Sequence, residues 1–194
     1  MDEKPAELHI RLQRPSNPGD RAAVLDLTSK AFGAQGEKTA LLVRALQASD
    51  AYDGLSFMAE SGRRMVGHTM LTRGWVDAAE RLVHVLVLSP LSVHPDHQGQ
   101  GVGRALVARA LQAADNAAAP AVFVEGDPAY YGRLGFEAAI PRGFTRPSIR
   151  IPEPAFQVTI LTAYEPWMSG ALVYSDRFWA LDCVGLRTPA GDTA

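Results

Sequence analysis

Residues 94–104 read HPDHQGQGVGR and separate an apolar run that ends at Val93 from the helix-like segment ALVARALQAA. Three glycines stand at alternate positions, Gly99, Gly101 and Gly103, and we expect them to take positive φ and to let the backbone approach a ligand closely. A helix that begins directly after such a turn leaves its first N–H groups unpaired at the positive end of its dipole. The stretch therefore predicts an anion-binding turn, with a strand-to-helix connection that binds nothing as the alternative.

The spacing of the glycines excludes two common phosphate-binding loops. A P-loop ends in Gly-Lys-Ser/Thr, whereas Gly103 is followed by Arg104 and Ala105. The dinucleotide-binding fingerprint places its third glycine where Arg104 stands. An unrelated nucleotide-binding α/β domain with the same kind of turn stays open at this point.

Hydrophobic periodicity outward from this turn predicts an α/β fold with a sheet of mixed direction and helices on both faces. Apolar runs predict strands over 8–14, 55–60, 65–71, 81–88 with a continuation through 93, 121–124, 156–162 and 171–174. Helical spacing predicts helices over 20–32, 37–48, 103–114 and 128–134. Asp20 is the expected N-cap of the first helix. Pro90 lacks an N–H donor, so we expect a bulge or a departure from the neighbouring strand there.

The composition fits one compact domain over residues 1–194. Of the 194 residues, 47% are hydrophobic and 21% are charged, which suffices for a core that folds unaided. The formal net charge of -2 disfavours nucleic acid and anionic membranes as partners. Cys183 is the only cysteine, which excludes an intramolecular disulfide and a cysteine-based metal cage. No signal peptide and no apolar stretch of about 18 residues is present, so we expect a soluble, cytoplasmic protein.

Two blocks of residues resemble the motifs of the GNAT superfamily of acyl-CoA-dependent N-acyltransferases. Gln98, Gly101 and Gly103 match its Gln/Arg-x-x-Gly-x-Gly/Ala signature, and the Val-x-Pro of residues 93–95 precedes it. Residues 131–136, YGRLGF, resemble its Tyr-x-x-x-Gly-Phe segment. Two motifs in the expected order are much more specific than one glycine-rich turn.

The resemblance covers about residues 8–136 and is specific over 91–136. The run GDPAYYGRLGF is similar to a poorly characterised bacterial branch of N-acetyltransferases. Residues 140–194 look like a less typical C-terminal extension of the same domain. The resemblance implies a mixed, mostly antiparallel sheet whose central parallel strand pair is splayed.

Membership of this family would imply acetyl-CoA as the acyl-donor cosubstrate, and no metal. In the family, the pantetheine arm lies between the splayed strands, paired with the backbone of the strand before the glycine turn, and the amides of the turn hold the pyrophosphate. The cofactor-binding residues implied here are Leu91, Ser92, Val93, Gln98, Gly99, Gln100, Gly101, Val102, Gly103, Arg104 and Tyr130.

Direct attack of a primary amine on the thioester requires a base and a proton donor, because an amine with a pKa of about 10.4 is mostly protonated at neutral pH. The resemblance implies that Tyr131 is the general acid, with Tyr130 as a weaker candidate. Glu125, at the end of a predicted strand, is the candidate base. No acid occurs between 81 and 93, where family members often carry a glutamate, so His84 and a water chain are the alternatives.

The remaining reactive side chains are interpreted as structural. The histidines and the aspartate within 94–97 are expected to cap the turn rather than to bind a metal. Cys183 is expected to be a buried thiol rather than an acyl carrier. Arg142, Arg146 and Arg150 are expected on a solvated loop, with an acidic substrate or the cofactor's 3′-phosphate as the alternative partner.

The sequence therefore predicts a cytoplasmic N-acetyltransferase that acts on a small-molecule or peptide amine. Nucleic acid and membranes are not expected as partners, and a homodimer is compatible with the sequence. A non-catalytic acyl-CoA sensor or scaffold of the same fold is the alternative function.

Overall fold

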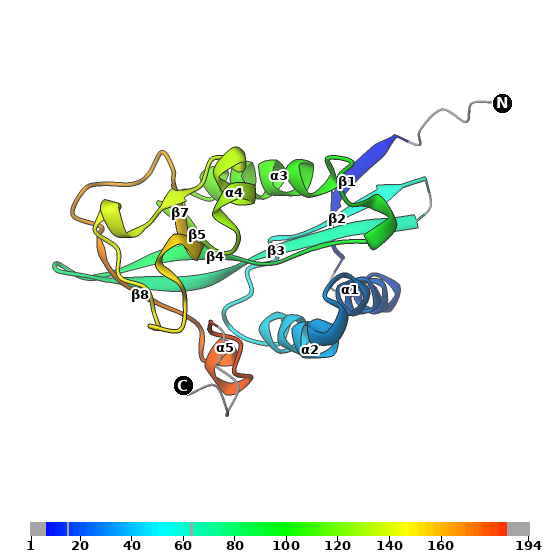
Figure 1. The fold of residues 1–194 in the computed structure, drawn as a ribbon, viewed down its shortest axis with the longest axis horizontal. Helices are drawn as coiled ribbons and strands as arrows, with labels where there is room; N and C mark the ends of the chain where they lie inside the picture. Colours follow the sequence, from blue (N-terminus) through cyan, green and yellow to red (C-terminus); the bar gives the residue numbers. More distant parts are fainter. Residues whose placement is uncertain (1–6, 15, 63, 186–194) are drawn as a thin grey trace, which may run out of the picture.

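The computed structural model describes residues 7–14, 16–62 and 64–185, and one central sheet carries helices on both faces (Figure 1). Its strands are β1 (Leu8–Leu12), β2 (Ser56–Ser61), β3 (Arg64–Ala78), β4 (Leu82–Val93), β5 (Ala121–Glu125), β6 (Glu137–Ala138), β7 (Phe156–Ile160) and β8 (Gly170–Val173). Its α-helices are α1 (Pro18–Ala31), α2 (Gly36–Gln47), α3 (Val102–Asn116), α4 (Pro128–Tyr131) and α5 (Asp176–Ala180). None of these described helices combines the length and hydropathy that a membrane span requires.

The sheet is mixed and mostly antiparallel, as the sequence predicts. Its strand order is β1-β2-β3-β4-β5-β7-β6, and β8 pairs with the far end of β3. Among the named strands, β4 and β5 form the parallel pair, and α3 connects them. Strands β7 and β8 and helix α5, which all lie after residue 140, join the same sheet and the layer beneath it.

The sheet separates two hydrophobic layers. Helices α1, α2 and α5 cover one face, and α3 and α4 cover the other (Figure 1). Alternation along β2 places Met58 in the layer of α1 and α2, and Phe57 in the layer of α3. Gly67 of β3 allows α3 to approach closely, because a Cβ at this position would lie 2.7 Å from Val102 Cγ1 and 2.8 Å from Leu106 Cδ1. The first turn of α3 is therefore seated directly on the sheet.

Strands β4 and β5 diverge at the point that Pro90 predicts. They pair in register only at Leu86 with Val122 and at Val87 with Phe123 within the described chain. On the other side of β4, the register with β3 shifts, so that Ser89 and Pro90 oppose a single residue. The predicted bulge and the predicted splay of the central parallel pair are both confirmed.

Several element boundaries differ from the predicted ones. The cap of α1 is Asn17, whose Oδ1 accepts from Gly19 N at 2.8 Å, so the prediction of Asp20 as the N-cap is wrong. Pro18 occupies the first turn, where its missing N–H is not needed, and this starts the helix two residues early. Strand β3 extends seven residues past the predicted end at residue 71, because pairing with β4 continues across the poor strand former Gly74.

Candidate functional site

Two cavities meet at the divergence of β4 and β5. The first has a volume of about 590 Å³ and lies between α2, the end of β5 and the chain after residue 140. The second, of about 780 Å³, lies between β4, the glycine turn and α4. Phe32, Leu91 and Tyr131 line both cavities, so these three side chains mark where the cavities adjoin.

The second cavity is built around the glycine turn. Gly99 and Gly101 have φ of +73° and +86°, and a Cβ at either would meet no atom within 4 Å. Helix α3 begins at the next residue with no side-chain cap at Gly101, so its first N–H groups stay available to an anion. The predicted geometry of an anion-binding turn is therefore present.

Gly103 has a different role from the other two glycines. It lies in the helix, and the prediction that it takes positive φ is wrong. A Cβ at Gly103 would lie 2.2 Å from the Tyr130 hydroxyl, so the glycine makes room for that ring against the first turn of α3. This close approach places Tyr130 in the wall of the second cavity.

The edge of β4 beside the turn carries backbone groups that do not face β3. His94 N donates to Val66 O at 2.9 Å, and in an antiparallel ladder the paired residues alternate. The N–H and C=O groups of Leu91 and Val93 consequently face the gap that β5 leaves. The Ser92 side chain lies on the face of the sheet that α1 covers. Its hydroxyl is fully buried there and donates to Thr28 Oγ1 at 3.3 Å.

The polar side chains of the turn are engaged with the turn itself. Gln98 Nε2 donates to Val93 O at 3.2 Å, and Gln100 Nε2 donates to Asp96 O at 2.9 Å. The His94 ring accepts from Asp96 N at 3.3 Å, which is the capping role expected from the sequence. These contacts shape the loop and leave anion contacts to backbone amides.

Positive charge enters the second cavity from two arginines. Arg104 on α3 and Arg133 beside α4 both line it and both are exposed. Burial raises the pKa of Tyr130, and the two guanidinium groups oppose that rise. Sequence reasoning did not single out Arg133, although it stands inside the YGRLGF motif.

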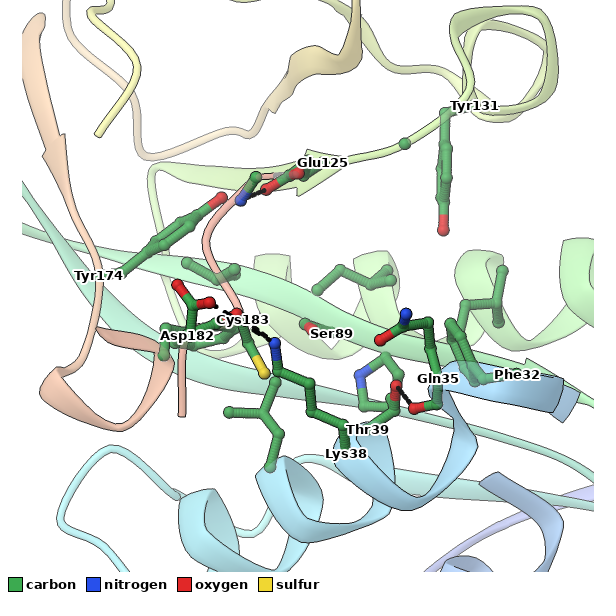
Figure 2. Close-up of a pocket in the computed structure, with 18 residues that line it drawn as sticks. Phe32, Gln35, Lys38, Thr39, Ser89, Glu125, Tyr131, Tyr174, Asp182 and Cys183 are labelled. Atoms are coloured by element: carbon green, nitrogen blue, oxygen red, sulfur yellow. Dashed lines mark hydrogen bonds and ion pairs between the residues drawn. The ribbon is translucent and has the colours of Figure 1, made fainter. Parts of the chain in front are cut away.

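Tyr131 is held at the junction of the cavities by the short helix α4. Asp127 caps this helix by accepting from Ala129 N at 2.8 Å. The Tyr131 ring packs edge-on against Phe136, with centroids 5.5 Å apart, and lies over Gly126, where a Cβ would approach the ring to 2.3 Å. Its hydroxyl points into the first cavity (Figure 2). Burial raises its pKa, so the phenol stays protonated at neutral pH.

Glu125, the last residue of β5, lines the first cavity. Its Oε2 accepts from Gly185 N at 3.3 Å, and Figure 2 shows the carboxylate beside this amide and near Tyr174, well separated from Tyr131. Burial raises the pKa of Glu125, while the Gly185 N–H and the positive charge of Arg150 oppose the rise. A raised pKa makes the carboxylate a stronger base once it is ionised.

His84, the alternative base, lies outside the first cavity. This residue is exposed near the start of β4, where its ring lies edge-on to Trp75 at 5.9 Å. It lines a third cavity of about 290 Å³ together with Asp53 and Arg73. That cavity shares no lining residue with the one that holds Tyr131 and Glu125.

The far wall of the first cavity comes from α2 and from the chain after residue 140. Lys38 Nζ donates to Asp182 O at 2.6 Å, and Arg150 Nη1 lies 3.1 Å from Asp182 Oδ1. Cys183 is only half-buried and lines the cavity, so its interpretation as a buried thiol is wrong in that respect. Burial nevertheless raises its pKa, which disfavours the reactive thiolate.

The two other arginines of the loop after β6 have structural partners. Arg142 pairs with Glu137 at 2.8 Å. Arg146 donates to Ile151 O at 2.7 Å and lies 3.4 Å from Glu153. Neither residue lines the cavity of the glycine turn, so the alternative of a contact with a cofactor phosphate is not supported.

Comparison with known proteins agrees with this geometry. Residues 21–136 match the acetyltransferase (GNAT) family. YjhQ, an uncharacterized N-acetyltransferase of Escherichia coli, is 31% identical over 169 residues, which cover 83% of this chain and 90% of that protein. The crystal structure of YhbS from E. coli in complex with CoA has a TM-score of 0.77 at 26% identity and covers 92% of this chain and 94% of its own.

A second solved structure is similar over nearly the same range. A GNAT family acetyltransferase from Brucella melitensis, crystallised with acetyl-CoA, has a TM-score of 0.70 at 28% identity, covering 89% of this chain and 99% of its own. Family match, sequence identity and fold thus agree over the range that contains the glycine turn and the YGRLGF motif. This chain therefore belongs to the GNAT family of acetyltransferases and is an acyltransferase.

Proposed function

We propose that this protein transfers an acetyl group from acetyl-CoA to a primary amine by direct attack in a ternary complex. The observation that carries the proposal is the position of Tyr131, at the junction of an anion-binding cavity and a cavity that contains a carboxylate. The solved relatives from E. coli and Brucella melitensis, which hold CoA and acetyl-CoA, support the choice of acyl donor.

The residues of the second cavity fit coenzyme A. The amides of 98–104 and the positive end of α3 would hold the diphosphate, with Arg104 and Arg133 adding charge at the rim. The outward-facing backbone groups of Leu91 and the N–H of Val93 would pair with the two amides of pantetheine, while the Val93 C=O already accepts from Gln98 Nε2. Bound in this way, acetyl-CoA supplies an acetyl thioester at the junction of the cavities.

Glu125 serves as the base for the acceptor. The amine enters as an ammonium ion, and the carboxylate takes its proton directly or through water and passes it to solvent. The freed lone pair then forms the C–N bond as the C–S bond breaks. The separation between Glu125 and Tyr131 leaves room for the acceptor between them (Figure 2).

Tyr131 serves as the proton donor for the leaving sulfur. Its raised pKa keeps the hydroxyl protonated, so the hydroxyl donates a hydrogen bond that strengthens as negative charge develops on sulfur. The proton it gives to the thiolate is balanced by the second proton lost from the nitrogen. Each turnover thus yields an acetylated amine, free CoA and one proton.

Catalysis accounts for this pairing better than acyl-CoA sensing does. A sensor requires the cofactor cavity alone, whereas here a proton donor and a candidate base line a second cavity that opens onto it. Membership of the acetyltransferase family also sets aside an unrelated nucleotide-binding domain.

Thiol release from acetyl-CoA in the presence of a panel of primary amines tests the proposal. We expect Tyr131→Phe to lower kcat by about 100-fold or more, because general acid catalysis contributes at least that much, while CoA binds with unchanged affinity. Equal rates for wild type and Tyr131→Phe would refute the assigned role. If none of the amines in the panel leads to thiol release, the proposed function is refuted.

A further inference from the structure

The first cavity, which receives the acceptor under the proposed function, is walled mainly by aromatic and apolar side chains. Its volume of about 590 Å³ is within the range of roughly 300–1,000 Å³ typical of small-molecule sites. Tyr174 and Phe178 are almost fully buried and pack together with ring centroids 4.9 Å apart. The apolar and aromatic side chains that would contact the body of the acceptor are those of Phe32, Leu42, Pro90, Leu91, Tyr174 and Phe178.

At the far wall of this cavity, the lining residues Lys38 and Asp182 and the neighbouring Arg150 form a cluster in which two cations share one carboxylate. Lys38 Nζ donates to the Asp182 carbonyl at 2.6 Å and lies 3.9 Å from its carboxylate. Arg150 lies 3.1 Å from the same carboxylate. Both cations are thus already engaged, and Asp182 already serves two positive partners. A substrate carboxylate or a second substrate ammonium would have to displace these contacts.

Glu125 is the remaining charged group that faces the cavity. It accepts from the Gly185 N–H and forms no ion pair with a cationic side chain of the described residues. Arg150 acts on this carboxylate only at longer range, so the place of a direct ion-pair partner is open to one ammonium group. A carboxylate adjacent to the attacking amine, as in an α-amino acid, would lie against Glu125 and be repelled.

We propose that the acceptor is a monocationic primary amine with an aromatic or apolar body, an arylalkylamine of the size of 2-phenylethylamine. The assignment rests on the proposed function and specifies its substrate class. The ammonium group binds at Glu125, and the ring occupies the apolar wall between Phe32 and Phe178. Amino acids and polyamines are poor acceptors, because among the described residues that line the cavity the one cation, Lys38, is already engaged, and Glu125 is the one carboxylate without an ion pair.

A matched panel tests this assignment with the wild-type chain. Thiol release is measured for 2-phenylethylamine, for phenylalanine, which adds a carboxylate to the same skeleton, and for spermidine, which replaces the ring with further ammonium groups. We expect kcat/KM for 2-phenylethylamine to exceed the other two by about tenfold or more, because like-charge contacts and unpaired buried charges are costly. Calorimetry should also show saturable binding of 2-phenylethylamine to the protein saturated with CoA.

The variant Asp182→Asn tests the charge argument. Asn tolerates the positive φ of +51° at this position, and the change leaves Lys38 and Arg150 without their shared carboxylate. We expect the preference for 2-phenylethylamine over phenylalanine to fall by about fivefold or more, since Lys38, which lines the cavity, then keeps only a neutral carbonyl partner and can meet a substrate carboxylate. Asp26→Asn is the control, because it removes an exposed partner of Lys30 outside the cavity and should leave the preference unchanged.

The outcomes separate the two proposals. Phenylalanine or spermidine reacting as fast as 2-phenylethylamine would overturn the acceptor class and leave acetyl transfer standing. An unchanged preference in a folded Asp182→Asn protein would overturn the charge argument on which the class depends. If no amine releases thiol although CoA binds, the proposed function itself fails. The wild-type panel decides the question even if Asp182→Asn does not fold.

Discussion

Burial raises the pKa of both Glu125 and Tyr131, with different consequences for their chemistry. For the carboxylate, a higher pKa means a stronger base, provided that the pH is high enough to ionise it. For the phenol, a higher pKa means a hydroxyl that stays protonated over the working range of pH. The same low-polarity environment at the end of β5 therefore suits one residue to accept a proton and the other to donate a hydrogen bond.

Glu125→Gln should remove the acidic limb of the pH profile. In the wild type, kcat/KM rises with pH as Glu125 ionises through its raised pKa. In the variant we expect a rate lower by about 100-fold near neutral pH and no inflection from this group. Measuring kcat/KM against pH for both proteins checks this, and an unchanged inflection in the variant would assign the base to another group.

Glu125→Gln lowers activity near neutral pH, but it should raise the stability of the fold at high pH. A carboxylate whose folded-state pKa is raised destabilises the fold increasingly as the pH rises through that pKa. Glu125→Gln should therefore raise Tm at about pH 8 and have little effect at about pH 4, where the wild-type side chain is already neutral. Thermal unfolding at the two pH values measures it, and a Tm that falls at the higher pH would contradict the account.

At the scale of elements, two glycines set how closely α3, α4 and the end of β5 approach. Gly103 accommodates the Tyr130 hydroxyl against the first turn of α3, and Gly126 accommodates the Tyr131 ring beside the end of β5. Each glycine thereby positions one tyrosine. Tyr130 lines the second cavity, which is proposed to bind CoA, and Tyr131 also lines the first cavity, which is proposed to bind the acceptor. Only Tyr131 faces the first cavity as well as the second.

A methyl group added at these positions should separate binding from catalysis. Gly103→Ala should raise the KM for acetyl-CoA, because it displaces Tyr130 from the cavity of the glycine turn. Gly126→Ala should instead lower kcat by about tenfold or more, since a displacement of about 1 Å in a catalytic group is already costly. Gly132→Ala is the matched control, because its Cβ would meet nothing within 4 Å at an ordinary φ of -56°.

Steady-state kinetics of the three alanine variants, with circular dichroism to verify folding, decides this point. Equal effects of Gly103→Ala and Gly126→Ala on both parameters would contradict the division of roles between the two tyrosines. A large effect of Gly132→Ala would show that the region does not tolerate substitution in general.

At the scale of the molecule, an ionic network joins the first strand to the layers around it. Asp20 on α1 is almost fully buried and accepts from Arg11 Nη1 at 2.7 Å and from Arg14 N at 2.9 Å. Arg11 also lies 2.7 Å from Glu60 on β2. The hydrogen bonds from Arg11 hold the pKa of Asp20 well below its usual range. The network thus ties β1, α1 and β2 together, outside both cavities.

Asp20→Asn should destabilise the fold without changing the chemistry. We expect a loss of about 1.5–3 kcal/mol in the free energy of unfolding near neutral pH, the usual range for hydrogen bonds to charged groups. Because the folded pKa of Asp20 is lowered, this stabilisation is present above the unfolded pKa and is lost as the pH falls through the folded value. Urea unfolding at about pH 7 and about pH 3 should show a difference that shrinks in acid. The exposed pair of Asp26 and Lys30 gives the control, with an expected change below about 0.5 kcal/mol in Asp26→Asn.

Much of the fold and of the cofactor cavity could be predicted from the sequence because their signals are local. The bulge at Pro90, the glycine turn and the YGRLGF motif each lie within a few residues. The wall of the first cavity could not be predicted in this way. Lys38 and Asp182 meet through a contact that spans 144 residues. The role of Gly103 is also visible only in three dimensions, where the Tyr130 hydroxyl packs against it. Cytoplasmic location and a homodimer stay predictions.

Calorimetric titration with coenzyme A tests the central claim, that the turn at 98–104 and the gap beside β4 form a CoA site. The account predicts saturable binding with a Kd in the micromolar range, and at least about tenfold weaker binding of ATP and NAD, which lack the pantetheine arm. No heat with coenzyme A, or equal affinity for the three nucleotides, would contradict it.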